Sequence, residues 1–173
     1  MKSTATIRRA NAADAVLLAQ IGEQSFVEAF GADNTPENMA AFLPTIFTPA
    51  IVTAELQEPT HEFYLLEVND ETAGYLKLRW PAPDERVSFK KALKICRLYL
   101  LRKFLGKGLG DQLMHFSLEK AKNVGCEAVW LTVWEHNPRA ISFYQKWGFT
   151  QSGTEDFILG NDVQLDYVMV KAL

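Results

Sequence analysis

The sequence predicts a mixed α/β fold in which a central sheet carries helices on both faces. Short apolar segments of strand length alternate with longer segments whose apolar residues recur at helical spacing. Proline and glycine bound many of these segments, as Pro138 and Gly148 bound one expected helix. The 173 residues, 48% of them hydrophobic and 23% charged, are enough for one ordinary core. We therefore expect a single domain over residues 1–173.

The N-terminal part is expected to be one strand followed by helices. The segment TATIRR at 4–9 predicts a short strand. Asn11 then caps a helix that runs to about Phe30. Two short helices near 36–43 and 49–57 follow, because each of these segments begins with a proline. The residues expected on one face of the first helix are Leu18, Ile21, Ser25 and Ala29.

The rest of the chain is expected to alternate strands and helices. EFYLLEV (62–68) and AGYLKLRW (73–80) flank the polar turn NDET and predict a hairpin, and the loop PAPDER follows. The strongly apolar KICRLYLL (94–101) predicts a central strand that is covered on both faces. The further expected elements are a helix at 108–123, a strand at 128–134, a helix at 138–147, and strands at about 149–158 and 164–171.

Net charge and composition narrow the range of functions to be considered. The formal net charge of −3 and the pI of about 5.6 argue against a nucleic-acid surface and permit a cationic substrate. Cys96 and Cys126 lie in apolar segments without metal-ligand spacing, which is typical of reduced core residues. No apolar run approaches ~20 residues, and MKSTATIRRANAADA lacks the apolar core of a signal peptide. We therefore expect a cytoplasmic protein that binds neither a membrane nor a metal.

A glycine-rich turn is expected just before the helix at 108–123. Residues 105–113 read LGKGLGDQL, with glycines at 106, 108 and 110. The N–H groups of a first helical turn and the helix dipole attract anions, and glycine lets a phosphate approach without meeting a Cβ. The spacing fits neither a P-loop nor G-x-G-x-x-G. Two interpretations stay open, a phosphate cradle or glycines that only ease a tight strand-to-helix turn.

A second polar pattern follows the strand expected at 128–134. In NPRAISFYQKWGF, residues 137–149, Asn137 can cap the helix and still offer its amide to a ligand. Tyr144 lies two helical turns further along the same face. The alternative is a helix cap and a tyrosine packed into the core.

Together the two segments resemble the coenzyme A signature of the GNAT superfamily, the acyl-CoA-dependent N-acetyltransferases. The glycine motif runs from Leu105 to Gly110, and Leu105 stands where the family has Gln or Arg. The resemblance covers essentially the whole chain and implies a mostly antiparallel sheet of about seven strands. The residues that match the second family motif are Asn137, Ala140, Phe143, Tyr144, Gly148 and Phe149.

The resemblance implies acetyl-CoA as co-substrate and no metal. Asn137 would contact the pantetheine region, and Tyr144 would protonate the departing thiolate. Lys107 would supply some of the charge that Leu105 lacks. Backbone groups of Leu98, Tyr99 and Leu100 would pair with the pantetheine arm, and the pyrophosphate would be held by Gly106, Lys107, Gly108, Leu109, Gly110 and Asp111.

The general base does not follow from the family pattern. The family's glutamate positions on the fifth and fourth strands correspond here to Thr132 and Lys94. Glu28 and Glu135 are candidates for a base or an amine anchor, with solvated carboxylates and a water relay as the alternatives. Acetyl transfer is expected to be direct, so Cys96 is interpreted as a core residue.

The acceptor is expected to be a small polycationic amine. The segments RLYLL and VWEHN and the C-terminal tail resemble bacterial spermidine/spermine N-acetyltransferases. Four acidic residues of the N-terminal helices would attract such a polycation: Glu23, Glu28, Asp33 and Glu37. The alternatives are a peptide, a protein or another small amine as acceptor, or a regulatory CoA-binding module without turnover. A homodimer is left open.

Overall fold

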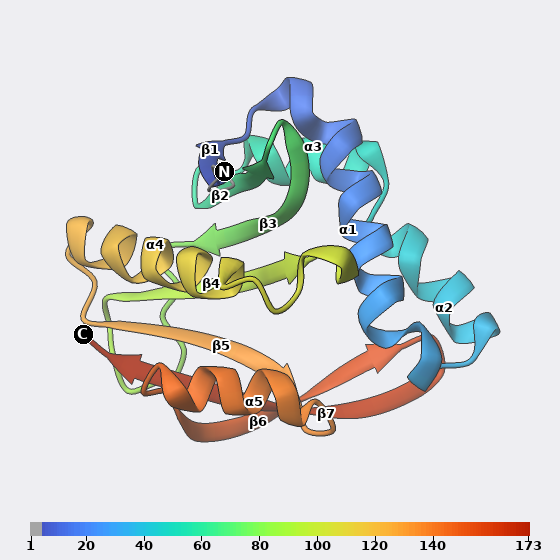
Figure 1. Ribbon diagram of the computed structural model, residues 1–173. Helices are drawn as coiled ribbons and strands as arrows, with labels where there is room; N and C mark the ends of the chain where they lie inside the picture. The colour runs from blue at the N-terminus through green and yellow to red at the C-terminus, as the bar shows by residue number, and fades with distance from the viewer. Residues whose placement is uncertain (1–4) are drawn as a thin grey trace.

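A computed structural model describes residues 5–173 and confirms the mixed α/β fold (Figure 1). Seven strands form one sheet in the order β1-β2-β3-β4-β5-β7-β6. Every neighbouring pair is antiparallel except β4 and β5. Thr4, the first residue of the expected strand at 4–9, lies outside the described residues. The strands are β1 Ala5–Arg9, β2 His61–Val68, β3 Glu71–Arg79, β4 Ala92–Leu100, β5 Ala128–Trp134, β6 Thr150–Leu159 and β7 Asp162–Ala172.

Helices cover both faces of the sheet. The helices α4 and α5 lie over one face, and α1 and α3 pack on the other, with α2 beside β6 (Figure 1). Within residues 5–173, no helix alone has the length and apolarity to cross a membrane; Pro36–Thr45 and Pro49–Gln57, bent by 42° to each other, meet those criteria only as a pair. The helices are α1 Ala15–Phe30, α2 Pro36–Phe42, α3 Pro49–Gln57, α4 Leu109–Asn123 and α5 Pro138–Lys146.

The first helix ends at Phe30 as predicted, but it begins later than predicted and buries a different face near its end. Asn11 caps a short 3-10 turn, Ala12–Asp14, through a capping box with the Asp14 carboxylate, and α1 begins only after this turn. Near the other end of α1, Ala29 is exposed whereas Phe26 is buried. The reason is that this half of α1 borders a cleft, so its inward face differs from that of a helix packed wholly on a sheet.

The hairpin turn between β2 and β3 is tighter than expected. Only Asn69 and Asp70 form it, with φ angles of 50° and 64°. Two-residue hairpin turns favour such backbone because its twist matches that of the flanking strands. Glu71 and Thr72, which were expected in the turn, belong to β3.

The parallel strands β4 and β5 separate soon after they meet. Their register pairs Ala92–Lys94 with Ala128–Trp130, and in the described chain no later residues of the two strands pair. On its other edge β4 stays paired with β3 as far as Leu100, with Cys96 as the extra residue of a β-bulge. From Ile95 onward, the edge of β4 that faces β5 therefore lies open.

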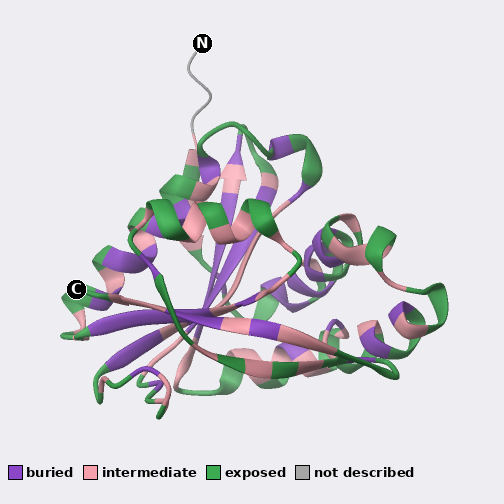
Figure 2. Ribbon diagram, turned by 90° about the horizontal axis from the view of Figure 1, so that it is seen from below, coloured by how far each residue is buried: buried purple, intermediate pink, exposed green. Residues whose placement is uncertain are grey.

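This separation corrects the expectation that the strand at 94–101 is covered on both faces. Ala92, Leu93 and Ile95 are buried, but the residues from Cys96 to Leu100 are only half-buried. Figure 2 shows the buried residues concentrated along the strands, with exposed residues on the outer sides of the helices. The C-terminal half of β4 therefore lines a cleft and is not part of a closed core.

Candidate active site

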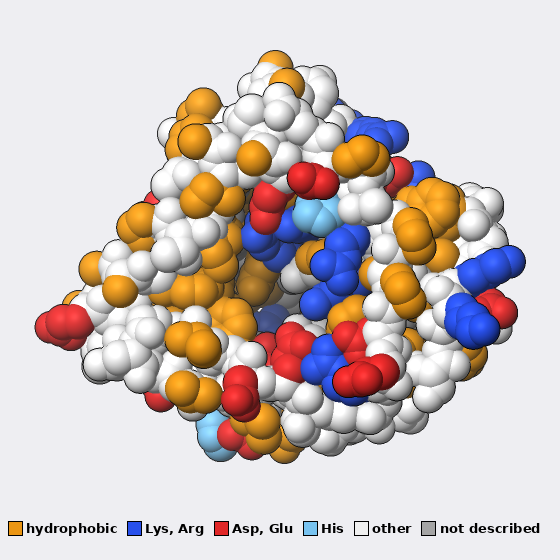
Figure 3. Space-filling view, turned by 180° about the vertical axis from the view of Figure 1, so that it is seen from behind, with side chains coloured by type: hydrophobic (Ala, Val, Ile, Leu, Met, Phe, Trp, Pro, Cys, Tyr) orange, Lys and Arg blue, Asp and Glu red, His pale blue; other side chains and the backbone are white. Residues whose placement is uncertain are grey.

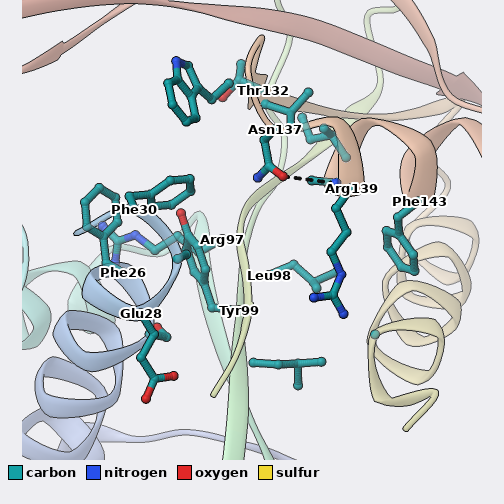
Figure 4. A pocket seen from close by; sticks show the side chains of 18 of the residues that line it. Phe26, Glu28, Phe30, Arg97, Leu98, Tyr99, Thr132, Asn137, Arg139 and Phe143 are labelled. Carbon is teal, nitrogen blue, oxygen red and sulfur yellow. Dashed lines mark hydrogen bonds between the residues drawn. The ribbon is translucent and has the colours of Figure 1, made fainter. Parts of the chain in front are cut away.

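A cleft of about 790 Å³ opens where β4 and β5 separate. Its walls come from the second half of α1, from β4, from the loop before α4 and from the first turns of α4 and α5. Figure 4 shows the residues of α1 on one side of β4 and those of α5 on the other. Side chains from both faces of the sheet thus reach one continuous space.

The glycine turn borders this cleft. Gly106 and Gly108 have φ angles of +75° and +73°, and a Cβ at either position would meet nothing within 4 Å. The positive φ angles alone therefore account for glycine at both positions. This agrees with the interpretation that the glycines ease a tight turn, and it leaves the phosphate cradle open. Gly108 is also the N-cap of α4, and because glycine has no side chain, no side-chain cap occupies the N–H groups at this end of the helix. The N–H groups of the first turn of α4 are thus available to an anion in the cleft.

Positive charge reaches this part of the cleft from Arg139 and not from Lys107. Lys107 does not line the cleft, and its ammonium lies 5.2 Å from the centre of the Phe104 ring. Arg139, in the first turn of α5, extends along the cleft beside Leu98 (Figure 4). Sequence reasoning missed Arg139, although its place two residues after Asn137 at a helix start could have suggested it.

Asn137 and Tyr144 both line the cleft. The Asn137 Oδ1 accepts the N–H of Ala140 at 3.2 Å, which leaves the amide nitrogen facing the cavity (Figure 4). Tyr144 lies two turns further along α5 and packs against the Phe149 ring with centroids 5.9 Å apart. Burial, and to a smaller extent the nearby Tyr99, raises the pKa of Tyr144 above its usual value. Its phenol therefore keeps its proton at neutral pH.

All but one of the predicted coenzyme residues line the cleft. The exception is Lys107. Leu105, which replaces the Gln or Arg of the related motif, also lines it. The predicted residues found there are Leu98, Tyr99, Leu100, Gly106, Gly108, Leu109, Gly110, Asp111, Asn137 and Tyr144.

Aromatic side chains form the wall on the α1 side. Phe30 makes edge contacts with Tyr99 and Trp134, each with ring centroids 6.3 Å apart. Sequence reasoning did not assign Phe30 or Trp134 to a site and used only the backbone of Tyr99, because single aromatic residues on a helix or strand are typical of a core. The aromatic residues that line the cleft on this side are Phe26, Phe30, Phe42, Phe47, Tyr99, Trp134 and Phe157.

The α1–α2 segment is joined to the β6–β7 hairpin at the end of this wall. Gln164 donates to the side chain of Asn34 at 2.7 Å, and the N–H of Asn161 donates to Asn38 at 3.1 Å. The rings of Phe42 and Phe157 are in contact, with centroids 5.4 Å apart. These contacts join two segments that are distant in sequence, and they narrow that end of the cleft.

The two predicted acidic residues occupy different environments. Glu28 lines the cleft, but its carboxylate accepts the N–H of Arg102 at 2.6 Å, and Arg102 donates to the Glu28 carbonyl at 2.7 Å. The bond from the Arg102 N–H lowers the pKa of Glu28, which makes it a weak base that fastens α1 to the loop before α4. Glu135 does not line the cleft and lies 3.5 Å from His136.

The residues at the family's two glutamate positions also lie in different places relative to the cleft. Thr132 lines the cleft, whereas Lys94 does not; its ammonium lies 4.5 Å from the Trp130 ring. A buried carboxylate that sequence reasoning missed, Asp166 of β7, does line it. No cluster of three His, Cys, Asp or Glu side chains suited to a metal occurs among residues 5–173.

Basic side chains gather in a hollow on the face opposite to that of Figure 1, with acidic ones at its edges (Figure 3). Between α3, β3 and β4, the Glu55 carboxylate pairs with Lys77 at 2.7 Å and with Arg97 at 3.2 Å. Burial works to raise the pKa of Glu55, but the charges of Arg97 and Lys77 outweigh it and hold the pKa below its usual value. Arg97 thus brings a cation to the α1 side of the cleft.

Comparisons with known proteins agree with this geometry. The acetyltransferase (GNAT) family model matches residues 24–149. An uncharacterized N-acetyltransferase in the pepI 3′ region of Lactobacillus delbrueckii subsp. lactis is 39% identical over 153 residues, which is 88% of each chain. The crystal structure of the PaiA N-acetyltransferase from Thermoplasma acidophilum in complex with coenzyme A covers 98% of this chain and 99% of its own, with a TM-score of 0.79 and 20% identity. The spermine/spermidine N(1)-acetyltransferase of Bacillus subtilis is 32% identical over 62 residues, 35% of this chain and 41% of that protein.

The substitutions Gly108→Ala and Gly125→Ala test the glycine turn as a matched pair. Their φ angles are +73° and +76°, and a Cβ would meet nothing within 4 Å at either, so both should lose a similar stability, about 1 kcal/mol. Gly108 lines the cleft and Gly125 does not. In calorimetry, Gly108→Ala should weaken acetyl-CoA binding at least tenfold, about 1.4 kcal/mol, and Gly125→Ala should bind like the wild type. Equal affinities would contradict an anion site at this turn.

Two substitutions separate the roles of Asn137. Asn137→Asp keeps an oxygen that can accept the Ala140 N–H but removes the amide donor, whereas Asn137→Ala removes both. Both variants should raise the KM for acetyl-CoA several-fold. Only the alanine variant should lose about 1 kcal/mol of stability through the missing cap. Initial rates and thermal denaturation measure the two effects, and a wild-type KM in Asn137→Asp would reduce this residue to a helix cap.

Proposed function

The chain belongs to the acetyltransferase (GNAT) family and is an acyl-CoA-dependent N-acetyltransferase, and we propose that it transfers the acetyl group of acetyl-CoA directly to the primary amine of a small acceptor. One observation carries this proposal. A single cleft contains the glycine turn, the open edge of β4 and the protonated phenol of Tyr144. The glycine turn would bind phosphate, the open strand edge would bind an extended chain, and the phenol would be the acid for the leaving thiolate.

The cleft offers complementary groups along the length of acetyl-CoA. The N–H groups at the start of α4 would bind the pyrophosphate, with Arg139 adding positive charge from α5. The open edge of β4 at Leu98–Leu100 would bond the amides of the pantetheine arm as a neighbouring strand would. The amide nitrogen of Asn137 would donate to the same arm.

The chemistry needs three contributions from this cleft. The acceptor amine must lose a proton, because an alkylamine has a pKa near ~10.4 like lysine. Backbone N–H groups of β4 beyond the bulge at Cys96 would polarise the thioester carbonyl. The Tyr144 phenol, which is protonated at neutral pH, would donate a proton to the thiolate as it leaves, in place of a proton from water. Holding both substrates in one cleft supplies proximity.

Spermidine or spermine, the acceptor expected from the sequence, has mixed support. The partial similarity to the Bacillus subtilis spermine/spermidine acetyltransferase favours it. The distribution of charge does not, because Glu23, Asp33 and Glu37 do not line the cleft. Glu28 is bonded to Arg102, and Arg97 brings a cation to the same side. Polyamines therefore belong among the acceptors to be tested, and we propose no acidic wall for them.

A small acceptor is favoured over a peptide by the contacts at the end of the cleft. Hydrogen bonds from Gln164 to Asn34 and from Asn161 to Asn38 join the α1–α2 segment to the β6–β7 hairpin. An extended peptide would have to break these contacts to pass between the two segments. An acetyl-CoA turnover screen over aromatic monoamines, polyamines, amino acids and peptides tests this, and activity on peptides alone would contradict it.

Tyr144→Phe is expected to lower kcat by about 10²-fold or more, in the usual range for general acid catalysis. The substitution removes one oxygen and keeps the ring that packs on Phe149. Calorimetric affinity for acetyl-CoA should change little, because its contacts come from backbone and Asn137. The loss should shrink with an acyl donor whose thiol is more acidic, since that thiolate needs a proton less.

The matched control is Tyr167→Phe, which removes a hydroxyl from β7 outside the cleft. It should keep wild-type kinetics. Wild-type turnover in Tyr144→Phe, with chemistry as the slow step, would remove this tyrosine from the mechanism. Negligible turnover in the wild type with every amine would instead favour a regulatory CoA-binding module.

A further inference from the structure

Asp166 is a buried carboxylate that lines the cleft. Its residue is 8% exposed, and it lines the cleft together with Gln164 of the same strand. In register, Asp166 lies opposite Trp134 on β5 and opposite Glu155 on β6. Residues directly opposite in antiparallel strands share a face of the sheet, so Asp166 lies on the same face as Trp134. That face carries the aromatic wall described above.

The Asp166 carboxylate has no partner within the described part of the chain. No hydrogen bond or ion pair to it occurs there, whereas Glu155 pairs with Arg86 at 2.9 Å. A buried carboxylate without a partner is costly, because the lost hydration is not replaced. Burial, and after it the charge of Glu155, raises the pKa of Asp166 to about 6, against an opposite effect of Lys94. Of the described charged groups around Asp166, only Lys94 acts against this cost, and it does not outweigh burial.

We propose that Asp166 receives the ammonium group of the acceptor and takes a proton from its nitrogen before the attack on the thioester. This inference rests on the proposed function. Aromatic rings lie on the same wall, where Phe30 and Trp134 make an edge contact, and aromatic faces attract ammonium groups. The Arg97 guanidinium on the α1 side is already paired with Glu55 at 3.2 Å, so it does not neutralise Asp166. An ammonium ion in this position would supply the positive partner that the buried carboxylate lacks.

The number of unpaired carboxylates in the cleft limits how many ammonium groups of an acceptor can be bound there. Of the other carboxylates that line the cleft, Glu28 is bonded to Arg102, and Asp111 accepts the indole N–H of Trp147 at 2.9 Å. One unpaired carboxylate beside aromatic rings fits one ammonium group on an apolar body. The inferred class is therefore an arylalkyl or other apolar primary monoamine.

The proton balance is simple. An acceptor R–NH3⁺ becomes the amide R–NH–CO–CH3, so its nitrogen loses two protons. Asp166 takes the first and releases it to solvent, which frees the nitrogen lone pair to form the C–N bond. The C–S bonding pair leaves with sulfur, which takes a proton from Tyr144. The second proton from nitrogen restores that of Tyr144, so both residues end as they began.

The test compares the pH profiles of wild type and Asp166→Asn with phenethylamine, benzylamine and spermidine as probes. The ionisable groups around Asp166 are Glu155 on β6 and Lys94 and Tyr99 on β4. In the wild type, kcat/KM should be level above about pH 6 and should fall below it, because protonated Asp166 cannot take a proton. In Asp166→Asn, kcat/KM should be at least about 10²-fold lower at pH 7.5. It should rise tenfold per pH unit towards the pKa of the amine, since only free amine then reacts.

Asp156→Asn is the matched control, an exposed carboxylate on the neighbouring strand β6 that does not line the cleft. It should keep the wild-type profile. The monoamines should also exceed spermidine in kcat/KM. A wild-type profile in Asp166→Asn would overturn the proposal even if acetyl transfer itself were confirmed.

Binding and stability distinguish this inference from the proposed function. If no amine is acetylated, calorimetry of phenethylamine on the CoA complex still tests it, because Asp166→Asn should abolish that binding. Binding that is unchanged in the variant, or absent in the wild type, would overturn the proposal. A raised pKa means that ionised Asp166 destabilises the fold above about pH 6, and this cost disappears as the pH falls. Asp166→Asn should therefore have a Tm at pH 7.5 no lower than that of the wild type, and a lower Tm with normal catalysis would mark a structural residue.

Discussion

The separation of β4 from β5 is the constraint on which the rest of the site depends. A parallel pair that stayed in register would cover the backbone groups of Leu98–Leu100 and close the space between them. Pairing instead stops at Lys94 and Trp130, and the bulge at Cys96 bends the strand on its way to the cleft. The helices α4 and α5 follow the two separating strands, so their N-terminal turns open into the same space. One irregularity of the sheet thus brings together an open strand edge, the glycine turn proposed to bind phosphate and the tyrosine proposed as general acid.

The acidic residues near this cleft illustrate how the fold assigns carboxylates to different tasks. Between α3, β3 and β4, Glu55 neutralises part of the charge of Lys77 and Arg97. Glu28 fastens α1 to the loop that leads to the glycine turn, so the α1 side of the cleft and this turn are mechanically linked. Among the buried carboxylates of residues 5–173, Asp166 alone has no hydrogen-bond or ion-pair partner. Structural carboxylates are satisfied here by the protein, whereas the unsatisfied one faces the space where a substrate would lie.

Local patterns in the sequence predicted the fold and much of the coenzyme side of the cleft. The glycine turn and the spacing of Asn137 and Tyr144 on one helix face are short-range signals, and the structure places these residues along one cavity. The acceptor side could not be predicted in this way. Asp166 and Phe30 line the same cleft only because β7 pairs with β5 and α1 packs across the sheet. Glu28 looked available in the sequence because its partner Arg102 lies 74 residues away along the chain.

Hydrogen–deuterium exchange measured with and without acetyl-CoA tests the central claim most directly. We predict that the amides of Leu98 and Leu100, which point away from β3, exchange readily in the free protein because no strand covers that edge, whereas neighbouring amides bonded to β3 are protected. Acetyl-CoA should protect the amides of Leu98 and Leu100 and those at 106–111, and should leave β1 and β2 unchanged. Protection in the glycine turn without any in β4 would contradict strand-like binding of the pantetheine arm. Full protection of the Leu98 and Leu100 amides in the free protein would contradict the open edge itself.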